Sequence, residues 1–198
     1  MEVMDGQRLR PTTIKKSQQK TKDMELAAEL RKPLLRAWLS ETGETSALIG
    51  AAVSAMNPEV FSAGLKCIEK VTRNPDVVTK GQHLSEVLAM WTSPYTGFSL
   101  INNRDTPLHR DNGAGYTAMD TLLTVGEYKN GWIYLPGLGY RLFYNSGTMV
   151  MLAGRVIRHA AAADGERLCC SWYLRSNVLQ ALNVEEPGWV NIDDFNNL

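Results

Sequence analysis

The chain has 198 residues, which suits one globular domain with a modest appendage and leaves no room for two full catalytic domains. Its 44% hydrophobic and 21% charged residues are close to the globular average, so wholesale disorder, a collagen-like chain and a coiled coil are excluded. Lysine plus arginine and aspartate plus glutamate both number 21. The resulting formal charge of zero does not by itself indicate a nucleic-acid or membrane partner.

The three cysteines are Cys67, Cys169 and Cys170. Their odd number and the absence of C-x-x-C spacing favour neither a disulfide framework nor a zinc site, and they indicate a reducing compartment. The longest nearly apolar stretch, residues 47–56, is far shorter than the roughly 20 residues of a membrane span. The sequence therefore predicts a soluble, intracellular protein without a membrane partner.

Both ends of the chain are polar and of opposite charge. Residues 7–22 carry six basic residues and no acidic one, so we expect a disordered basic arm over 1–22. It is either a solvated tail or a nuclear-import or phosphate-contacting arm, and the second interpretation predicts a nuclear protein. Residues 183–198 carry four acidic residues and no basic one, which predicts an acidic C-terminal tail.

Residues 23–91 show apolar side chains at intervals of three and four, which predicts three or four helices. Pro33 is expected to end or kink the first helix. Asn57 and Pro58 form a turn that restarts a helix with proline near its first position.

Residues 92–182 consist of short β-branched and aromatic segments separated by glycine and proline turns. Strands so closely spaced, without helices between them, favour an antiparallel sandwich or jelly roll. Asp120 and Glu127 are expected to lie in a strand pair and to face solvent. The predicted fold class is α+β, with a double-stranded β-helix (jelly-roll) core over 92–182 and an N-terminal helical region over 23–91 that packs on it.

The chain has only three histidines, so the placement of each is informative. His109 and Asp111 form an H-x-D pair after a predicted strand, and His159 ends a later strand. Residues two apart on a strand point to the same side, so His109 and Asp111 can converge on one ion while Arg110 faces away. Two imidazoles and a carboxylate form the facial triad that suits non-haem Fe(II). The alternative is a turn in which Asp111 caps the loop at Asn112.

Arg167 opens the last predicted strand, eight residues after His159. Alternation puts the polar residues of this strand on one face and its apolar residues on the other. The polar face comprises Arg167, Cys169, Ser171, Tyr173 and Arg175. An arginine on such a face inside a barrel can bind a carboxylate through two parallel hydrogen bonds. The alternative is an edge-strand arginine paired with a surface acid.

These residues together resemble the Fe(II)/2-oxoglutarate-dependent dioxygenases, whose motif is H-x-D, a distal histidine and a later arginine. Within that superfamily the chain is most similar to the TET and J-binding-protein branch, including its fungal members, over about residues 98–178. The order of several segments carries the resemblance. They are NRDTPLHRD, TLLTVGEY, IYLPGLGYRL, GTMVMLAGRVIRH and GERLCCSWYLR.

The resemblance implies a set of cofactors and the residues that bind them. His109, Asp111 and His159 correspond to the residues that hold Fe(II) in that family. Arg167 corresponds to the arginine that binds the distal carboxylate of 2-oxoglutarate, with O2 as the other co-substrate.

Five further positions follow from the same resemblance. Asn103 is implied as a co-substrate contact, with a simple strand-end polar residue as the alternative. Cys169 stands where many relatives have a serine that contacts the co-substrate. Tyr173 matches an aromatic that packs on the extruded base, and Arg175 matches another base contact. Ala114 stands where some relatives have a polar base contact, so this contact is expected to be missing.

The implied reaction is hydroxylation of the methyl group of a methylated DNA base, with 5-methylcytosine favoured and N6-methyladenine as the alternative base. Two rivals remain open. One is an oxygenase acting on a protein side chain or a small metabolite, which the neutral net charge favours. The other is a catalytically silent jelly roll that binds DNA or a protein. Only the enzyme interpretations require the triad and Arg167 to converge.

Overall fold

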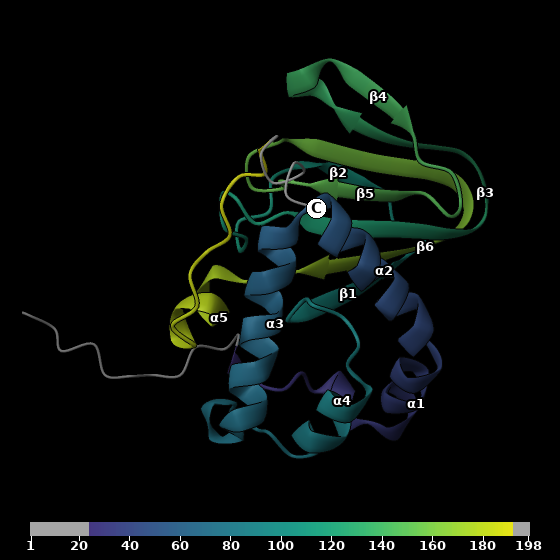
Figure 1. The fold of residues 1–198 in the computed structure, drawn as a ribbon. Coiled ribbons are helices and arrows are strands. Elements are labelled where there is room, and N and C mark those ends of the chain that lie inside the picture. The colour runs from purple at the N-terminus through teal and green to yellow at the C-terminus, as the bar shows by residue number, and fades with distance from the viewer. Residues whose placement is uncertain (1–23, 192–198) are drawn as a thin grey trace, which may run out of the picture.

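The structure, a computed structural model, describes residues 24–191 (Figure 1). The basic arm predicted over residues 1–22 lies outside the described residues, as do residues 192–198 of the predicted acidic tail. Helices precede the strands along the chain. They are η2 (Glu29–Arg31), α1 (Pro33–Glu41), α2 (Gly43–Met56), α3 (Pro58–Arg73), η3 (Pro75–Val77) and α4 (Leu84–Met90).

Prolines begin helices in this region. Pro33 is the first residue of α1, so the prediction that it ends or kinks a helix was wrong. Proline is suited to the first helical turn because its missing N–H needs no partner there. Pro58 begins α3 as predicted, and the side chain of Asn57 caps this helix by accepting a hydrogen bond of 3.0 Å from the Val60 N–H.

Antiparallel strands follow the helices, and one short helix ends the core. The strands are β1 (Gly97–Asn102), β2 (Thr106–His109), β3 (Asp120–Leu135), β4 (Tyr140–Phe143), β5 (Met149–Leu152) and β6 (His159–Tyr173). A single 3₁₀ turn, η4 (Pro136–Leu138), links β3 to β4, and α5 (Ser176–Ala181) comes after β6. The sequence pattern did not indicate α5, because the segment was read as all-β.

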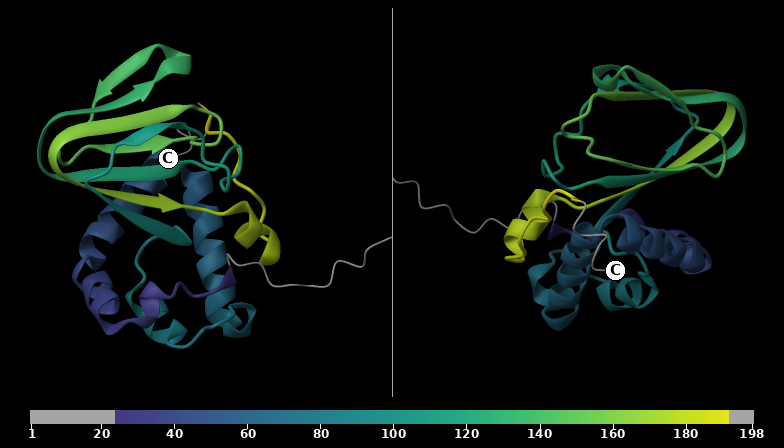
Figure 2. Two further views of the ribbon diagram at one scale, coloured as in Figure 1. Left: turned by 180° about the vertical axis from the view of Figure 1, so that it is seen from behind. Right: turned by 45° about the horizontal axis from the view of Figure 1, so that its top comes forward.

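Two long strands, β3 and β6, pair with each other through most of their length and organise the sheet. The C-terminal half of β6 also pairs with β1 and its first residues pair with β2, whereas β3 pairs with β5 at its start and β4 at its end. Each long strand therefore takes part in both halves of a sheet that folds over on itself (Figure 2). Gly126 and Gly165 lie where the sheet bends and have φ angles of 139° and 123°, which side chains rarely permit. The α+β jelly-roll fold is confirmed.

The helices lie against one face of the folded sheet (Figure 1). The even-numbered residues of β6 form that contact: Cys170 and Trp172 join a buried cluster with Val53 of α2 and with Val60 and Cys67 of α3. Odd-numbered residues of β6 face the interior of the folded sheet instead, as the alternation predicted. Among residues 24–191, no helix is long and apolar enough to cross a membrane.

We predict that Trp172→Ala destabilises the protein by about 3–5 kcal/mol, since it leaves a cavity between the sheet and the helices. Trp172 is only 5% exposed. Trp189→Ala is the matched control, because Trp189 is 52% exposed, and its unfolding free energy should change little. Urea denaturation followed by far-ultraviolet circular dichroism measures both. Equal unfolding free energies for the two variants would contradict the packing described here.

Candidate functional site

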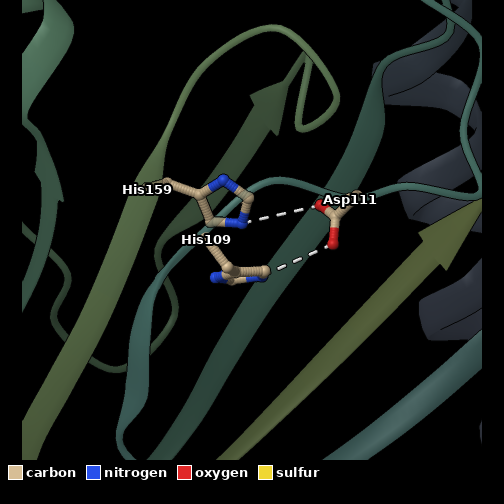
Figure 3. A group of neighbouring side chains, drawn as sticks. All are labelled: His109, Asp111 and His159. Atoms are coloured by element: carbon tan, nitrogen blue, oxygen red, sulfur yellow. Dashed lines mark ion pairs between the residues drawn. The ribbon is translucent and has the colours of Figure 1, made fainter.

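Strand pairing brings the two later histidines together. His109 is the last residue of β2 and lies opposite His159, the first residue of β6, in an antiparallel register. Their ring centroids are 4.2 Å apart. Asp111 follows β2 by two residues, and its carboxylate faces both imidazoles from one side (Figure 3). Residues separated by 50 positions along the chain thus meet at one end of the jelly roll.

The three side chains have the geometry of a metal site. Asp111 Oδ1 lies 3.4 Å from His109 Nε2, and Asp111 Oδ2 lies 3.6 Å from His159 Nε2. One ligand atom from each residue lies within 4.8 Å of the others. Two imidazole nitrogens and a carboxylate oxygen are donors that suit non-haem iron, and three ligands leave coordination positions open. The donor set therefore fits Fe(II).

Backbone carbonyls orient both imidazoles. His109 Nδ1 lies 2.8 Å from the Pro107 carbonyl, and His159 Nδ1 lies 3.0 Å from the Ile157 carbonyl. A carbonyl can only accept, so each Nδ1 carries the proton and each Nε2 presents a lone pair towards Asp111. Burial also lowers the pKa of His159 and so favours its neutral form. Both imidazoles are therefore preset as metal ligands before any ion binds.

Gly154 fixes the position of the Asp111 carboxylate. The Asp111 N–H donates a hydrogen bond of 3.0 Å to the Gly154 carbonyl. A Cβ atom at residue 154 would collide with Asp111 Oδ2, so only glycine leaves room for the carboxylate in this position. No short sequence pattern links residue 154 to Asp111, because the contact forms through the tertiary fold.

Arg167 is a buried guanidinium without a counter-ion among the described residues. It is 4% exposed, and no ion pair to it forms within residues 24–191. Its Nη2 donates a hydrogen bond of 2.7 Å to the Arg104 carbonyl. The alternative of a surface arginine paired with an acid does not hold, because Arg167 is buried. An uncompensated buried cation costs free energy unless an anion joins it, so this residue fits a carboxylate-bearing ligand such as 2-oxoglutarate.

Asn103 holds the backbone at Arg167. Its Oδ1 accepts a hydrogen bond of 2.7 Å from the Arg167 N–H, and its Nδ2 donates to the Glu166 carboxylate. Asn103 has a φ of 45°, a left-handed conformation that asparagine tolerates better than most residues. Both ends of its amide are engaged by the protein in this structure.

Cys169 lies two residues beyond Arg167 on the inner face of β6. It is 6% exposed, and its Sγ lies 3.7 Å from the Tyr144 hydroxyl. Burial raises the pKa of the Cys169 thiol, so the residue is an uncharged thiol at neutral pH. Tyr144 is also buried. Burial raises the pKa of its hydroxyl, and the positive charge of Arg167 partly offsets this rise. No sequence pattern pointed to Tyr144 at this position.

Tyr173 and Arg175 form a stacked pair near the end of β6. The Arg175 guanidinium carbon lies 4.2 Å from the centroid of the Tyr173 ring. Both residues line a cavity of about 1010 Å³ that extends to β1 and the helices. Within the described part of the chain, the lining of this cavity includes neither the triad nor Arg167.

Asp120 is a buried acid, and its burial was not predicted from the sequence. It was expected to face solvent, yet it is only 6% exposed. Burial raises its pKa to about 7, and the negative charge of Asp111 adds to the rise. Glu127 of the same strand is exposed as expected. Alternation cannot say which face of a strand is inner, so the burial of Asp120 was not predictable from the pattern around it.

Comparison with known protein families shows to which family a chain with this arrangement of residues belongs. Residues 16–176 match the family model Tet_JBP, described as the oxygenase domain of the 2OGFeDO superfamily. The chain belongs to the Tet_JBP family. It therefore contains the oxygenase domain of the superfamily whose members use Fe(II), 2-oxoglutarate and O2, and the predicted family and enzyme class are confirmed.

One solved structure supports the fold of this Tet_JBP chain. It is NgTET1 in complex with 5mC DNA, with a TM-score of 0.53 and 14% sequence identity. The similarity covers 87% of this chain and 62% of the NgTET1 chain. This chain thus spans less than two thirds of that structure. No curated protein sequence matches the chain.

We predict that Gly154→Ala lowers the metal affinity of this Tet_JBP chain by about 10- to 100-fold, although it changes no candidate ligand. The added methyl group displaces the Asp111 carboxylate. Anaerobic titration with Co(II), followed by visible absorption, measures the affinity. Gly137→Ala is the matched control, since a Cβ there meets no atom within 4 Å. Asp111→Ala gives the reference for complete loss, and a Gly154→Ala affinity equal to wild type would refute the assignment.

Proposed function

We propose that this chain hydroxylates the methyl group of a methylated base in DNA, with 5-methylcytosine as the favoured base. The convergence of His109, Asp111 and His159 in a Tet_JBP chain carries the proposal. The similarity to NgTET1, which was solved with 5mC DNA, supports the choice of substrate.

His109 and His159 would hold iron through Nε2, and Asp111 would hold it through its carboxylate. Bound iron supplies the activation of O2, coupled to oxidation of 2-oxoglutarate, that oxidises a methyl C–H bond. The protein contributes the fixed positions of these ligand side chains. The carbonyls of Pro107 and Ile157 fix both imidazoles, so the ligands need no rearrangement when the metal binds.

Arg167 binds the distal carboxylate of 2-oxoglutarate. Its guanidinium is buried without an ion pair among residues 24–191. A bound carboxylate neutralises its charge and accepts hydrogen bonds from its N–H groups. Asn103 supports this role as a positioning residue, because its Oδ1 accepts a hydrogen bond from the Arg167 N–H. Cys169 and Tyr144 form the adjoining wall.

Tyr173 and Arg175 contact the base. A base in duplex DNA must leave the stack at a cost of a few kcal/mol before a buried site can act on its methyl group. The Tyr173 ring offers a surface for stacking, and the Arg175 guanidinium offers hydrogen-bond donors only. The stacked arrangement of the two side chains supports this role.

The basic segment that contains His159 supports a polyanionic substrate. Between Glu127 and Asp164 the chain carries four basic residues and no acidic one. They are Lys129, Arg141, Arg155 and Arg158. Arg158 directly precedes His159 and is exposed. Cations placed in this way can contact phosphates even though the net charge of the chain is zero.

We predict that Arg167→Ala raises the KM for 2-oxoglutarate by about tenfold or more, since a charged hydrogen-bonded pair contributes about 1.5–3 kcal/mol. Succinate formation against 2-oxoglutarate concentration measures it. Arg73→Ala is the matched control, because the Arg73 side chain is 78% exposed on α3. An unchanged KM in Arg167→Ala would remove this residue from the co-substrate site.

The substrate is tested by incubating the Fe(II)-loaded protein with 2-oxoglutarate, O2 and duplexes that contain or lack 5-methylcytosine. We expect the methylated duplex to stimulate succinate formation and to yield 5-hydroxymethylcytosine, detected by mass spectrometry. A protein that consumes 2-oxoglutarate without this stimulation would instead be a hydroxylase of a protein side chain or a small metabolite. A protein that retains no iron would be a silent binding module.

A further inference from the structure

The hairpin formed by the end of β3 and by β4 has an outward-facing side that is rich in aromatic residues. Ile133 is buried in the cluster between the two halves of the sheet, so its neighbours Trp132 and Tyr134 point to the opposite, outer side. Their cross-strand partners in β4 are Phe143 and Arg141, which share this side. We call these four outward residues the hairpin face. Figure 1 shows the hairpin on the side of the folded sheet away from the helices.

The hairpin face is exposed although most of it is apolar. Phe143 is 85% exposed, and Tyr134 is also exposed. Further large apolar side chains of the same hairpin are exposed, namely Leu138, Tyr140 and Leu142. The solvent side of an antiparallel sheet is normally polar, and a continuous exposed apolar patch is typical of a binding surface. Among the described strands, β4 pairs with β3 alone, so its outer edge is also open to a partner.

The charge on the hairpin face is positive. The guanidinium carbon of Arg141 lies 4.7 Å from the centroid of the Trp132 ring, so a cation and an aromatic ring form one unit. No acidic residue occurs from residue 128 to residue 163, a stretch that includes the whole hairpin. The exposed Arg158 directly precedes β6, whose first residues pair with this part of β3. A complementary partner is therefore anionic and offers flat surfaces to the rings.

Nucleic acid with unpaired bases meets both requirements. Each nucleotide supplies a phosphate and a planar base, and proteins bind single strands by stacking aromatic side chains on successive bases. In a duplex the faces of the bases are covered by their neighbours. A second copy of the chain is a poorer match. A two-fold interface brings the same surface against itself, and the hairpin face carries a cation without an acid to pair with it.

We propose that the hairpin face is a second nucleic-acid-binding surface, which takes unpaired nucleotides by stacking on Phe143 and Tyr134 while Arg141 contacts phosphate. The surface is on the outer side of the sheet and contains no residue of the metal triad, so the inference goes beyond the proposed function. The two places nevertheless share a strand, because Tyr134 pairs with Ala160, the residue after His159. A single strand on the hairpin face is therefore retained beside the metal site without entering it.

The first test compares two oligonucleotides of equal charge. The wild-type full chain is titrated into fluorescein-labelled oligodeoxyuridylate, which carries no methyl group, and into an abasic strand of the same length. Fluorescence anisotropy gives the two Kd values. We expect the Kd of the abasic strand to be about fivefold or more higher, since it cannot stack. Equal Kd values would show that charge alone is recognised, and absence of binding would show no such surface; either result overturns the inference.

Phe143→Ala is the matched protein variant, because so exposed a side chain contributes little to folding. We expect it to raise the Kd for oligodeoxyuridylate about fivefold or more. Trp189→Ala removes an exposed aromatic outside the hairpin and should keep the wild-type Kd. Arg141→Ala should reduce the slope of log Kd against log salt concentration by about 0.7, the value for one phosphate contact on a single strand. An unchanged Kd in Phe143→Ala, or a rise in Tyr173→Ala alone, overturns the inference.

Sedimentation equilibrium tests a second copy as the occupant. A wild-type dimer that Phe143→Ala dissociates, without binding of oligodeoxyuridylate to either protein, would assign the hairpin face to self-association and overturn the inference. Binding of the unmethylated strand is measured without turnover. A failure of this binding is therefore distinguishable from a failure of the proposed hydroxylation.

Discussion

The pairing of β2 with the start of β6 is the interaction on which the site depends. It sets His109 opposite His159, and neither imidazole could reach the other if the register moved by one residue, since alternate residues point to opposite faces. The same strand, β6, continues into a second half that pairs with β1 and packs on the helices through Trp172. Stability of the helical layer and geometry of the metal site are thus linked by one strand.

The parts of the site that follow from local pattern could be predicted from the sequence. The two-residue spacing of His109 and Asp111 and the alternation along β6 are properties of a strand that need no knowledge of the fold. That alternation correctly separated Arg167, on the inner face, from Trp172, on the face covered by helices. The order of the motifs along the chain then identified the family, which no single motif could do.

What the sequence could not predict depends on contacts between distant segments. Gly154 shapes the site through its contact with Asp111, 43 positions away along the chain, and nothing around residue 154 marks it. Asp120 lies at a strand end, where polarity normally indicates exposure, and only the folded-over sheet shows that it is buried. Pro33 was misread because a proline is equally suited to follow a helix or to begin one, and the apolar spacing continued across it.

The bend of β6 at Gly165 also has a consequence for the size of molecule that the enzyme accepts. On a straight strand, the Cα atoms of His159 and Arg167 would be about 26 Å apart, far beyond the reach of a five-carbon dicarboxylate. Gly165, at a φ of 123°, and the register shift in the ladder to β3 between Lys129 and Trp132 allow β6 to bend between these two residues. A strand that ran straight here could not present Arg167 and the His109–Asp111–His159 cluster to one small molecule.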